Sequence, residues 1–381
     1  MDGTQTSGSG AYVHVPFCSR RCDYCAFATW TDREHLWERY AKAVEREARL
    51  RAGSAHGPLT SVFFGGGTPS LVPADLLVGM LSAVVEAFGL APGAEVTVEC
   101  NPGTLTSQKL EAYRRAGVTR LSLGAQSMVP HVLASLGRQH SPGVVREAVA
   151  LLAEAGFGAS YNIDLIYGAA AESPEDWRRS LDEVLSLEPV PPHLSTYALT
   201  VEPGTPLAAS PERHPVDDDQ ADKYLVADQV LSAVGYRWYE LSNWAVPGHE
   251  CRHNQLYWDQ GEYVGLGCAA HSHQRLAAGG SRRWWNVRTP ERYCRLVEAG
   301  ALPEAASEDL TAAQVQWEAL VLAMRTRRGA PAPSVPPELV DEGLVELTTG
   351  ADGGRGVLTA RGRLLANEVT LRLQAPGGGL G

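Results

Sequence analysis

The sequence predicts an α/β fold: a partial (β/α)6 barrel of the TIM type with a small C-terminal α+β domain. Between residues 11 and 242, short β-branched runs alternate with longer helical patterns. A strand followed by a helix, repeated about six times, builds a parallel sheet with right-handed crossovers. Polar residues also stand at the ends of several predicted strands, where parallel α/β folds place their sites. An open doubly wound sheet has the same pattern, and the partial barrel is our preferred interpretation.

The predicted strands are short segments rich in β-branched and aromatic residues. They span 11–15, 59–64, 95–99, 118–123, 160–166, 193–199 and 236–241. The helices between them are recognised by their boundary residues. A helix from Asp32 to Arg51 ends at Gly53, Ser141-Pro142 opens a helix that Gly156 closes, and Ser173-Pro174 opens another.

The C-terminal domain is predicted from two helical stretches, two short strands and a final helix. These segments span 307–325, 337–342, 344–348, 356–358 and 362–371. Helices followed by a hairpin resemble a winged-helix-like module, and the acidic helices argue against DNA binding. The expected division of the chain is a disordered tail, the barrel, a connecting region, the C-terminal domain and a second disordered tail, over 1–10, 11–242, 243–302, 303–374 and 375–381.

Composition and charge exclude several classes of protein. The formal net charge of −11 argues against a nucleic-acid partner, because phosphate binding needs a concentrated positive surface. No run approaches the roughly 18 apolar residues of a membrane span, and the first residues lack the features of a signal peptide. An odd number of cysteines, 7, suits a reducing compartment better than a disulfide framework. We therefore expect a cytoplasmic protein with no membrane span.

Three cysteines follow the first predicted strand with the spacing C-x3-C-x2-C: Cys18, Cys22 and Cys25. A [4Fe–4S] cluster held by three thiolates leaves one iron open to a small ligand. Structural zinc fits less well, because its ligands usually come as two separated C-x2-C pairs and no second pair follows. Chance spacing is the remaining alternative. The spacing favours an iron–sulfur cluster that takes part in chemistry.

A glycine run ends the second predicted strand, where Gly65, Gly66 and Gly67 precede Thr68. Consecutive glycines let the backbone approach a ligand and expose successive N–H groups that suit a carboxylate or phosphate. The run lacks the lysine of a P-loop and the G-x-G-x-x-G spacing of a dinucleotide site. A tight turn before the following proline is the structural alternative.

Polar side chains also stand at the ends of the next strands. Glu99 ends the third, Gln126 and Arg138 follow the fourth, and Asp164 interrupts the apolar fifth. Burying a carboxylate without partners costs several kcal/mol, so ionisable groups that converge at strand ends suggest a bound polar ligand. Asp164 alone could equally cap a neighbouring loop.

The stretch from residue 12 to about 258 resembles the radical S-adenosylmethionine family. The similarity is to the branch that contains oxygen-independent coproporphyrinogen III oxidases and HemW-type haem chaperones. The motifs are YVHVPFCSRRCDYCAF, FFGGGTPS, VECNPGT, RLSLGAQS, LGRQH, NIDLIYG and YALTVEPGTPL. The resemblance implies that the three cysteines hold a [4Fe–4S] cluster, whose open iron is chelated by the amino and carboxylate groups of S-adenosylmethionine. One electron then yields methionine and a 5′-deoxyadenosyl radical.

Carried over position by position, the resemblance also assigns ligand contacts. It implies that the cofactor S-adenosylmethionine contacts Tyr12, Gly66, Gly67 and Thr68. It further implies that Glu99, Gln126, Arg138 and Asp164 line the ribose, carboxylate and sulfonium surroundings of the same cofactor.

Two departures separate the branches of the family. The oxidase branch has a further cysteine, C-x3-C-x2-C-x-C, where this chain has Ala26 followed by Phe27. The oxidase branch also has a longer N-terminal extension than the roughly ten residues that precede the first strand here. Both differences favour the chaperone branch.

A motif near residue 253 favours the same branch. His253, Asn254, Tyr257 and Trp258 match the HNxxYW pattern of HemW-type chaperones, which is linked to haem binding. An imidazole can bind haem iron and aromatic faces suit a macrocycle, so His253 is the predicted axial ligand. Its rivals are Cys251, His271 and His273, and a structural histidine is the plain alternative.

The sequence therefore predicts a haem chaperone that binds haem and passes it to acceptor haem proteins, including membrane-associated respiratory enzymes. Its expected cofactors are a [4Fe–4S] cluster, S-adenosylmethionine and haem. The alternative is an oxygen-independent coproporphyrinogen III oxidase. A third possibility is a cluster protein that does not use haem.

Overall fold

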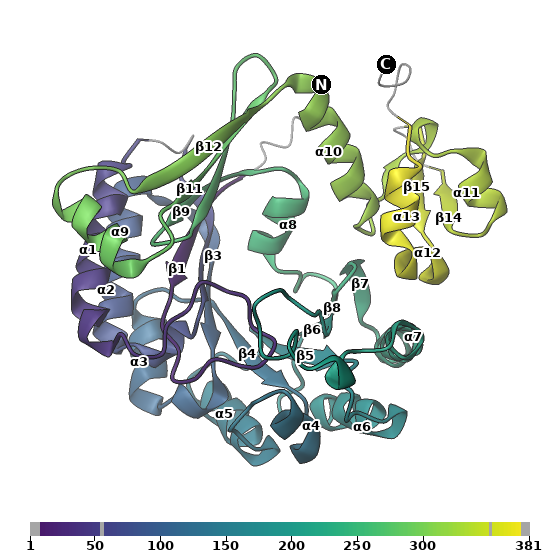
Figure 1. The fold of residues 1–381 in the computed structure, drawn as a ribbon, viewed down its shortest axis with the longest axis horizontal. Helices are drawn as coiled ribbons and strands as arrows, with labels where there is room; N and C mark the ends of the chain where they lie inside the picture. Colours follow the sequence, from purple (N-terminus) through teal and green to yellow (C-terminus); the bar gives the residue numbers. More distant parts are fainter. Residues whose placement is uncertain (1–7, 54–56, 350–352, 375–381) are drawn as a thin grey trace.

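A curved twelve-stranded sheet dominates the computed structural model of the protein, which describes residues 8–53, 57–349 and 353–374 (Figure 1). Six consecutive strands, each parallel to the next, form its centre. They are β1 (Ser9–Val15), β2 (Leu59–Gly66), β3 (Leu90–Cys100), β4 (Arg120–Gln126), β5 (Tyr161–Tyr167) and β6 (His193–Ala198). The predicted partial barrel is confirmed. Most of the expected terminal tails, 1–7 and 375–381, lies outside the described residues, whereas Ser9 and Gly10 begin β1.

Helices cover the outer face of the parallel strands (Figure 1). They are α1 (Trp37–Leu50), α2 (Ala74–Phe88), α3 (Ser107–Arg115), α4 (Pro130–Ser135), α5 (Pro142–Glu154), α6 (Pro174–Leu185) and α7 (Asp217–Ala233). Alternate residues of β1, Ala11, Val13 and Val15, are fully buried among apolar side chains. Because strand side chains alternate between faces, the residues between them point into the barrel.

Strands between residues 237 and 310, a range that includes the expected connecting region 243–302, extend the sheet on both sides. On one side β8 (Asn243–Ala245) pairs antiparallel with β6, and β7 (Arg237–Glu240) pairs with β8. On the other side β9 (Glu262–Leu266) runs parallel to β1. Antiparallel strands β10 (His271–Arg275), β11 (Ser281–Asn286) and β12 (Glu304–Leu310) follow it. The short helix α8 (Arg252–Trp258) lies on the inner side of the sheet, and α9 (Pro290–Glu298) lies outside (Figure 1).

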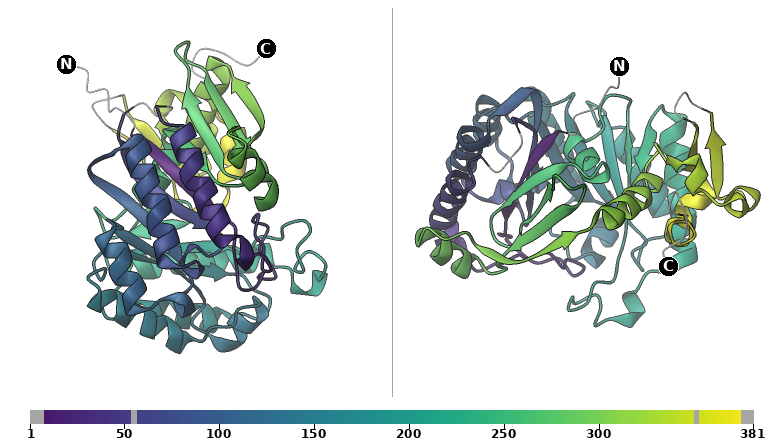
Figure 2. Two further views of the ribbon diagram at one scale, coloured as in Figure 1. Left: turned by 90° about the vertical axis from the view of Figure 1, so that its left-hand side faces the viewer. Right: turned by 90° about the horizontal axis from the view of Figure 1, so that it is seen from above.

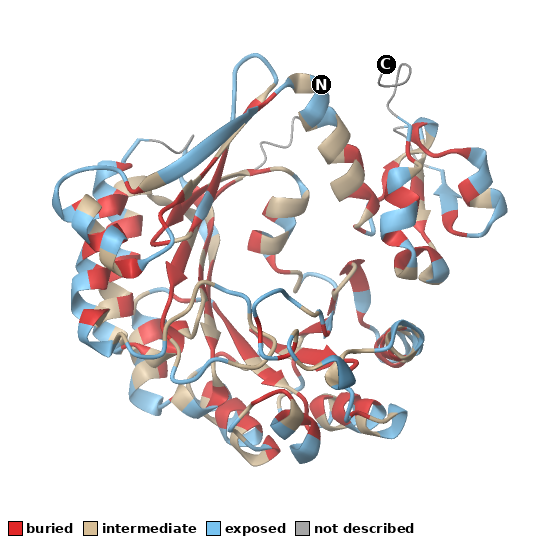
Figure 3. Ribbon diagram, in the orientation of Figure 1, coloured by how far each residue is buried: buried red, intermediate tan, exposed pale blue. Residues whose placement is uncertain are grey.

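One predicted helix begins later than expected. Residues 307–310, predicted to be helical, belong to the exposed strand β12 (Figure 3). Within this strand, Glu308 pairs across the sheet with Arg283 at 2.8 Å. The helix α10 (Ala312–Met324) starts after Thr311, whose hydroxyl and the side chain of Gln314 form a capping box. Cross-strand ion pairs and a later cap therefore decided the boundary.

The C-terminal residues form a small α+β module around a core of their own (Figure 2, right). Its sheet has the order β13-β15-β14. Its elements are β13 (Ala330–Pro331), α11 (Pro337–Asp341), β14 (Val345–Thr348), β15 (Arg355–Leu358), α12 (Ala360–Leu364) and α13 (Ala366–Leu371). Arg363 fastens the module to the barrel, since its guanidinium lies 2.8 Å from Asp228 on α7 and 4.6 Å from the ring centroid of Trp238.

A buried lysine joins α7 to the loop after β5. The Lys223 ammonium donates to Asp219 at 2.7 Å and to the backbone oxygen of Glu172 at 2.7 Å, and lies 3.3 Å from the Glu172 carboxylate. The Lys223 side chain is 2 % exposed and that of Glu172 is 0 % exposed. Burial raises the pKa of Glu172 to about 7 even though Lys223 lowers it.

In the described part of the chain, no helix is both long enough and apolar enough to cross a membrane.

Candidate functional site

The loop after β1 carries the three predicted cluster cysteines, and all three are half-buried. Its two ends are pinned by backbone bonds, from Cys18 N–H to Trp30 O at 3.1 Å and from Trp30 N–H to Pro16 O at 2.8 Å. Two donors reach the sulfur atoms: Thr68 Oγ1 lies 3.7 Å from Cys18 Sγ, and Arg138 Nη1 lies 3.3 Å from Cys22 Sγ. Burial raises the pKa of the Cys18 thiol to about 11.

Among the described residues, no three His, Cys, Asp or Glu side chains are arranged around a single metal ion. A [4Fe–4S] cluster does not need three ligands around a single metal ion, because each of its thiolates binds a different iron. The three cysteines lie close enough for the other two to raise the pKa of Cys18. Donors aimed at the sulfurs stabilise thiolates, so the loop fits a cluster.

The glycine turn does not offer its N–H groups to a ligand, which corrects the prediction of an anion cradle. Gly66 N–H donates to Glu99 Oε2 at 3.1 Å, Gly67 N–H donates to Val15 O at 2.8 Å, and Thr68 N–H donates to Phe17 O at 2.8 Å. A Cβ at Gly67 would lie 2.6 Å from Phe17 O. Gly67 is needed because the turn packs here directly on the backbone that leads into the cysteine loop.

Two carboxylates, Glu99 and Asp164, are half-buried on the inner face of the barrel. Burial and the nearby Asp164 raise the pKa of Glu99 to about 8, against one hydrogen bond from Gly66. Burial also raises the pKa of Asp164, which accepts from Ser122 Oγ at 2.9 Å and from Asn162 Nδ2 at 2.6 Å. The Asp164 carboxylate therefore accepts hydrogen bonds from several uncharged donors, whereas the Glu99 carboxylate accepts one.

The raised pKa of Glu99 predicts a pH dependence of stability. An acid whose pKa is higher in the folded state contributes stability below its unfolded pKa, and this stability is lost as pH rises through the folded pKa. We expect the melting temperature to fall between about pH 5 and about pH 8, and to fall less in Glu99→Gln, which has no charge to bury. Calorimetry across this range tests it. An equal fall in both proteins would contradict the assignment.

Gln126 lies at the end of β4 in a conformation that is rare for its residue type. Its φ is +67°, and Ser127 N–H donates to Ala125 O at 2.9 Å, which makes Gln126 the centre of a γ-turn. Positive φ for a non-glycine residue costs on the order of 1–3 kcal/mol and clusters at functional sites. Arg138 lies beside this turn and donates to Gly124 O at 2.9 Å. The predicted residues Gln126 and Arg138 are therefore neighbours, next to the cysteine loop.

Tyr12 points into the barrel from β1 and is joined to the cysteine loop through His14. The Tyr12 hydroxyl donates to His14 Nδ1 at 3.0 Å, and His14 Nε2–H donates to Ala28 O at 3.0 Å. Burial lowers the pKa of His14 to about 4, so this imidazole is neutral. Sequence reasoning missed His14, because a histidine inside an apolar strand has no motif of its own.

His253 is enclosed by protein in this structure. It is 1 % exposed, burial lowers its pKa to about 3, and its ring stacks on Phe63 with centroids 5.2 Å apart. Its Nδ1 donates to Ser61 Oγ or accepts from it at 2.9 Å, and its Nε2 shares a hydrogen bond with the Tyr257 hydroxyl at 2.9 Å. Both ring nitrogens are thus engaged. Tyr257 and Trp258 are only half-buried, and Trp258 Nε1 has no partner among the described residues.

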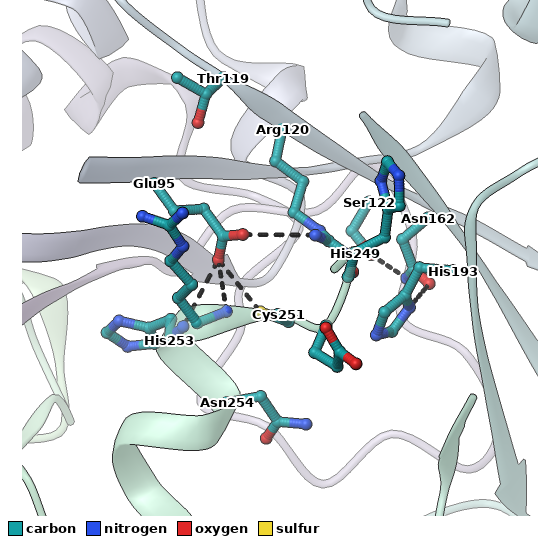
Figure 4. Close-up of polar contacts among 12 residues, drawn as sticks. Glu95, Thr119, Arg120, Ser122, Asn162, His193, His249, Cys251, His253 and Asn254 are labelled. Atoms are coloured by element: carbon teal, nitrogen blue, oxygen red, sulfur yellow. Dashed lines mark hydrogen bonds and ion pairs between the residues drawn. The ribbon is translucent and has the colours of Figure 1, made fainter. Parts of the chain in front are cut away.

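A chain of hydrogen bonds links this motif to the predicted ligand site. Asn254 Nδ2 donates to the Tyr239 hydroxyl at 3.2 Å, which donates to His193 Nε2 at 2.8 Å. His193 Nδ1 then bonds to the amide oxygen of Asn162 (Figure 4). The Asn162 nitrogen donates to Asp164. All donors point the same way, so the bonds polarise one another.

The rival candidates for the haem axial ligand lie in different environments. Cys251 and His273 are buried, whereas His271 is exposed and stacks on Trp285.

The structure brings most predicted site residues to one end of the barrel. The cysteine loop, the glycine turn, Glu99, Gln126 and Arg138 meet at the carboxyl ends of parallel strands. His253 lies deeper, against β2, and reaches this end only through other side chains. Sequence reasoning also missed the polar inner residues nearer the strand starts. These are Ser61, Glu95, Arg120, Asn162 and His193.

Comparisons with known proteins agree with these motifs. The model of the Radical SAM superfamily matches residues 12–184. Heme chaperone HemW of Mycobacterium tuberculosis (strain ATCC 25618 / H37Rv) is 41% identical, over 96% of this chain and 94% of its own length. Heme chaperone HemW of Escherichia coli (strain K12) is 36% identical over 74% of each chain.

A solved structure shows the same fold. Coproporphyrinogen III oxidase (HemN) from Escherichia coli, described as a Radical SAM enzyme, superposes with a TM-score of 0.80. The match covers 96% of this chain and 89% of that chain at 22% sequence identity. Identity this low establishes the fold and leaves the activity open.

Proposed function

Because this chain belongs to the HemW haem chaperone family of the Radical SAM superfamily, we propose that it binds haem and passes it to acceptor haem proteins. The observation that carries the proposal is the HNxxYW helix α8, set inside a radical SAM barrel whose cysteine loop has Phe27 in place of a fourth cysteine. The protein works in the cytoplasm in this proposal. Its acceptors include membrane-associated respiratory enzymes.

Cys18, Cys22 and Cys25 hold the [4Fe–4S] cluster in this proposal. Two contacts support the assignment, since Thr68 and Arg138 direct donors at Cys18 Sγ and Cys22 Sγ. When bound, the cluster supplies one-electron chemistry at an iron that no protein thiolate occupies. Thr68 and Arg138 hold charge on the sulfurs, and the pinned loop keeps them facing the barrel.

S-adenosylmethionine binds at the carboxyl end of the barrel in this proposal. Tyr12 and the Gly66–Thr68 turn form its near wall, and Glu99, Gln126, Arg138 and Asp164 surround it. Thr97 supports this placement, because its buried hydroxyl has no partner among the described residues and lies on the same strand face as Glu99. Glu99 and Asp164 accept from hydroxyl or amine groups, and the Arg138 guanidinium meets a carboxylate.

Haem binds against α8 in this proposal, with His253, Asn254, Tyr257 and Trp258 forming the site. The orphaned Trp258 Nε1–H supports it, since a propionate oxygen can accept this bond. The half-buried rings of Tyr257 and Trp258 offer apolar faces to a macrocycle. His253 binds the iron only after the Tyr257 hydroxyl leaves Nε2, so Tyr257 competes with haem for this nitrogen.

A pair of variants tests the ligand role of His253. We expect His253→Ala to lose the axial-ligand signature in the haem spectrum and to weaken binding at least tenfold, about 1.4 kcal/mol. Tyr257→Phe frees Nε2 and keeps the ring, so it should bind haem as tightly as wild type or more tightly. Spectrophotometric haem titration measures both. Equal loss in the two variants would make His253 a structural residue.

One reaction decides between the chaperone and the oxidase. The protein with its cluster restored is incubated anaerobically with coproporphyrinogen III, S-adenosylmethionine and dithionite. We expect no protoporphyrinogen, because the chain lacks the further cysteine of the oxidase branch. Stoichiometric or catalytic formation of protoporphyrinogen would overturn the proposal.

A further inference from the structure

The helix α8 that carries the HNxxYW motif begins without a cap of its own. Its N-cap residue, Cys251, makes no side-chain capping bond, although the first N–H groups of a helix lack intrahelical partners. The missing hydrogen-bond acceptor comes from the strand β3. Glu95 Oε1, on β3, accepts from Arg252 N–H at 2.9 Å and from His253 N–H at 3.4 Å, and the Cys251 thiol donates to it at 3.4 Å.

The Glu95 carboxylate is itself held by a buried cation. Arg120, the first residue of β4, lies 3.3 Å from Glu95 Oε2, and the two side chains are 6 % and 10 % exposed. Arg120 also donates to the backbone oxygen of His249 at 2.9 Å, on the segment that leads into α8 (Figure 4). A second contact, from Arg252 Nη1 to Gly93 O at 2.6 Å, ties the same helix end to β3.

We propose that Glu95 and Arg120 are a positioning pair that fixes the start of α8 and so sets where the HNxxYW side chains face. Glu95 accepts from the backbone of His253, and the ring of His253 is then directed onto Phe63 and Ser61. A carboxylate at this end also interacts favourably with the aligned peptide dipoles of the helix. The side-chain hydrogen bonds of Glu95 and Arg120 reach α8, the segment before it and each other, and Arg120 acts on the predicted contact Asp164 only through its charge.

The haem part of this inference rests on the proposed function, whereas the positioning of α8 does not. Hydrogen exchange read by mass spectrometry on the full chain tests the positioning. In Glu95→Ala we expect exchange over 252–260 to rise at least about tenfold, with that of β1–β6 nearly unchanged. Glu95→Gln keeps an oxygen acceptor for α8 but leaves Arg120 without a counter-charge. It should therefore keep α8 protected while it lowers the melting temperature.

Glu304→Ala is the matched control, because Glu304, on β12, pairs with the buried Arg51 at 3.2 Å and with Arg282, and neither partner belongs to α8. It should leave exchange over 252–260 unchanged. Unchanged exchange in Glu95→Ala, or an equal rise across all parallel strands, would overturn the positioning role. Loss of α8 protection in Glu95→Gln equal to that in Glu95→Ala would also contradict it.

Haem titration of the same variants separates this inference from the proposed function. If wild type binds haem, Glu95→Ala should bind at least about tenfold more weakly and Glu304→Ala equally well. If wild type and Glu95→Ala bind haem equally tightly although exchange over 252–260 has risen in the variant, the haem part of the inference alone is overturned. A wild type that binds no haem refutes the proposed function, and the exchange experiment still decides the positioning.

Discussion

Replacing any one of Cys18, Cys22 or Cys25 with serine is expected to remove the iron–sulfur cluster from the protein. Two remaining thiolates leave two irons without a protein ligand, and serine is a poor substitute for the soft thiolate donor. Iron and acid-labile sulfide should fall from about four of each per chain to below about a tenth of that value. Metal analysis and sulfide analysis after anaerobic reconstitution measure both.

Cys294→Ala is the control for this prediction. Cys294 is a free cysteine, buried in α9 away from the loop, so its loss should leave the iron content unchanged. Circular dichroism should show the same helix content in all four variants. A serine variant that kept the full iron and sulfide content would refute the assignment of that cysteine.

Replacing Lys223 with methionine is expected to cause a large loss of stability. The change leaves the fully buried Glu172 carboxylate without its cation, and breaking a buried pair from one side costs about 3–5 kcal/mol. The loss should grow with pH. Glu172 has a raised pKa, so its stabilising contribution is lost as pH rises, and removing Lys223 raises that pKa further. Chemical denaturation at about pH 5.5 and about pH 8 measures it.

Lys42→Met is the matched control, because Lys42 is exposed on α1. Its effect should stay within about 0.5 kcal/mol at both pH values. The double variant Lys223→Met with Glu172→Gln should recover part of the loss, since no buried charge is left unpaired. A small, pH-independent effect of Lys223→Met would show that water or another group replaces the ammonium.

Much of the barrel and of its carboxyl end could be predicted from sequence. The six parallel strands alternate with helices, and the ends of parallel strands share one edge, so Glu99, Gln126 and Arg138 had to approach the cysteine loop. Local signals were sufficient because Glu99 and Gln126 lie at the ends of β3 and β4, and Arg138 follows the short helix α4 after β4.

Other features depended on contacts between distant segments. The acceptor that Glu95 offers to α8 comes from a residue 157 positions away in the chain, and no local pattern marks it. The N–H groups of the glycine turn looked free in sequence because their partners, Val15 and Phe17, lie on another strand and its loop. The added strands β9–β12 were missed because they follow the barrel without a new motif, β9 parallel to β1 and β10–β12 antiparallel to their neighbours.

The most direct test of the central claim is an anaerobic titration of the wild-type protein, with its cluster restored, by haem. The account predicts a saturable Soret change with about one haem bound per chain. Absence of any saturable Soret change would contradict it, and would leave a radical S-adenosylmethionine fold whose task is not haem delivery.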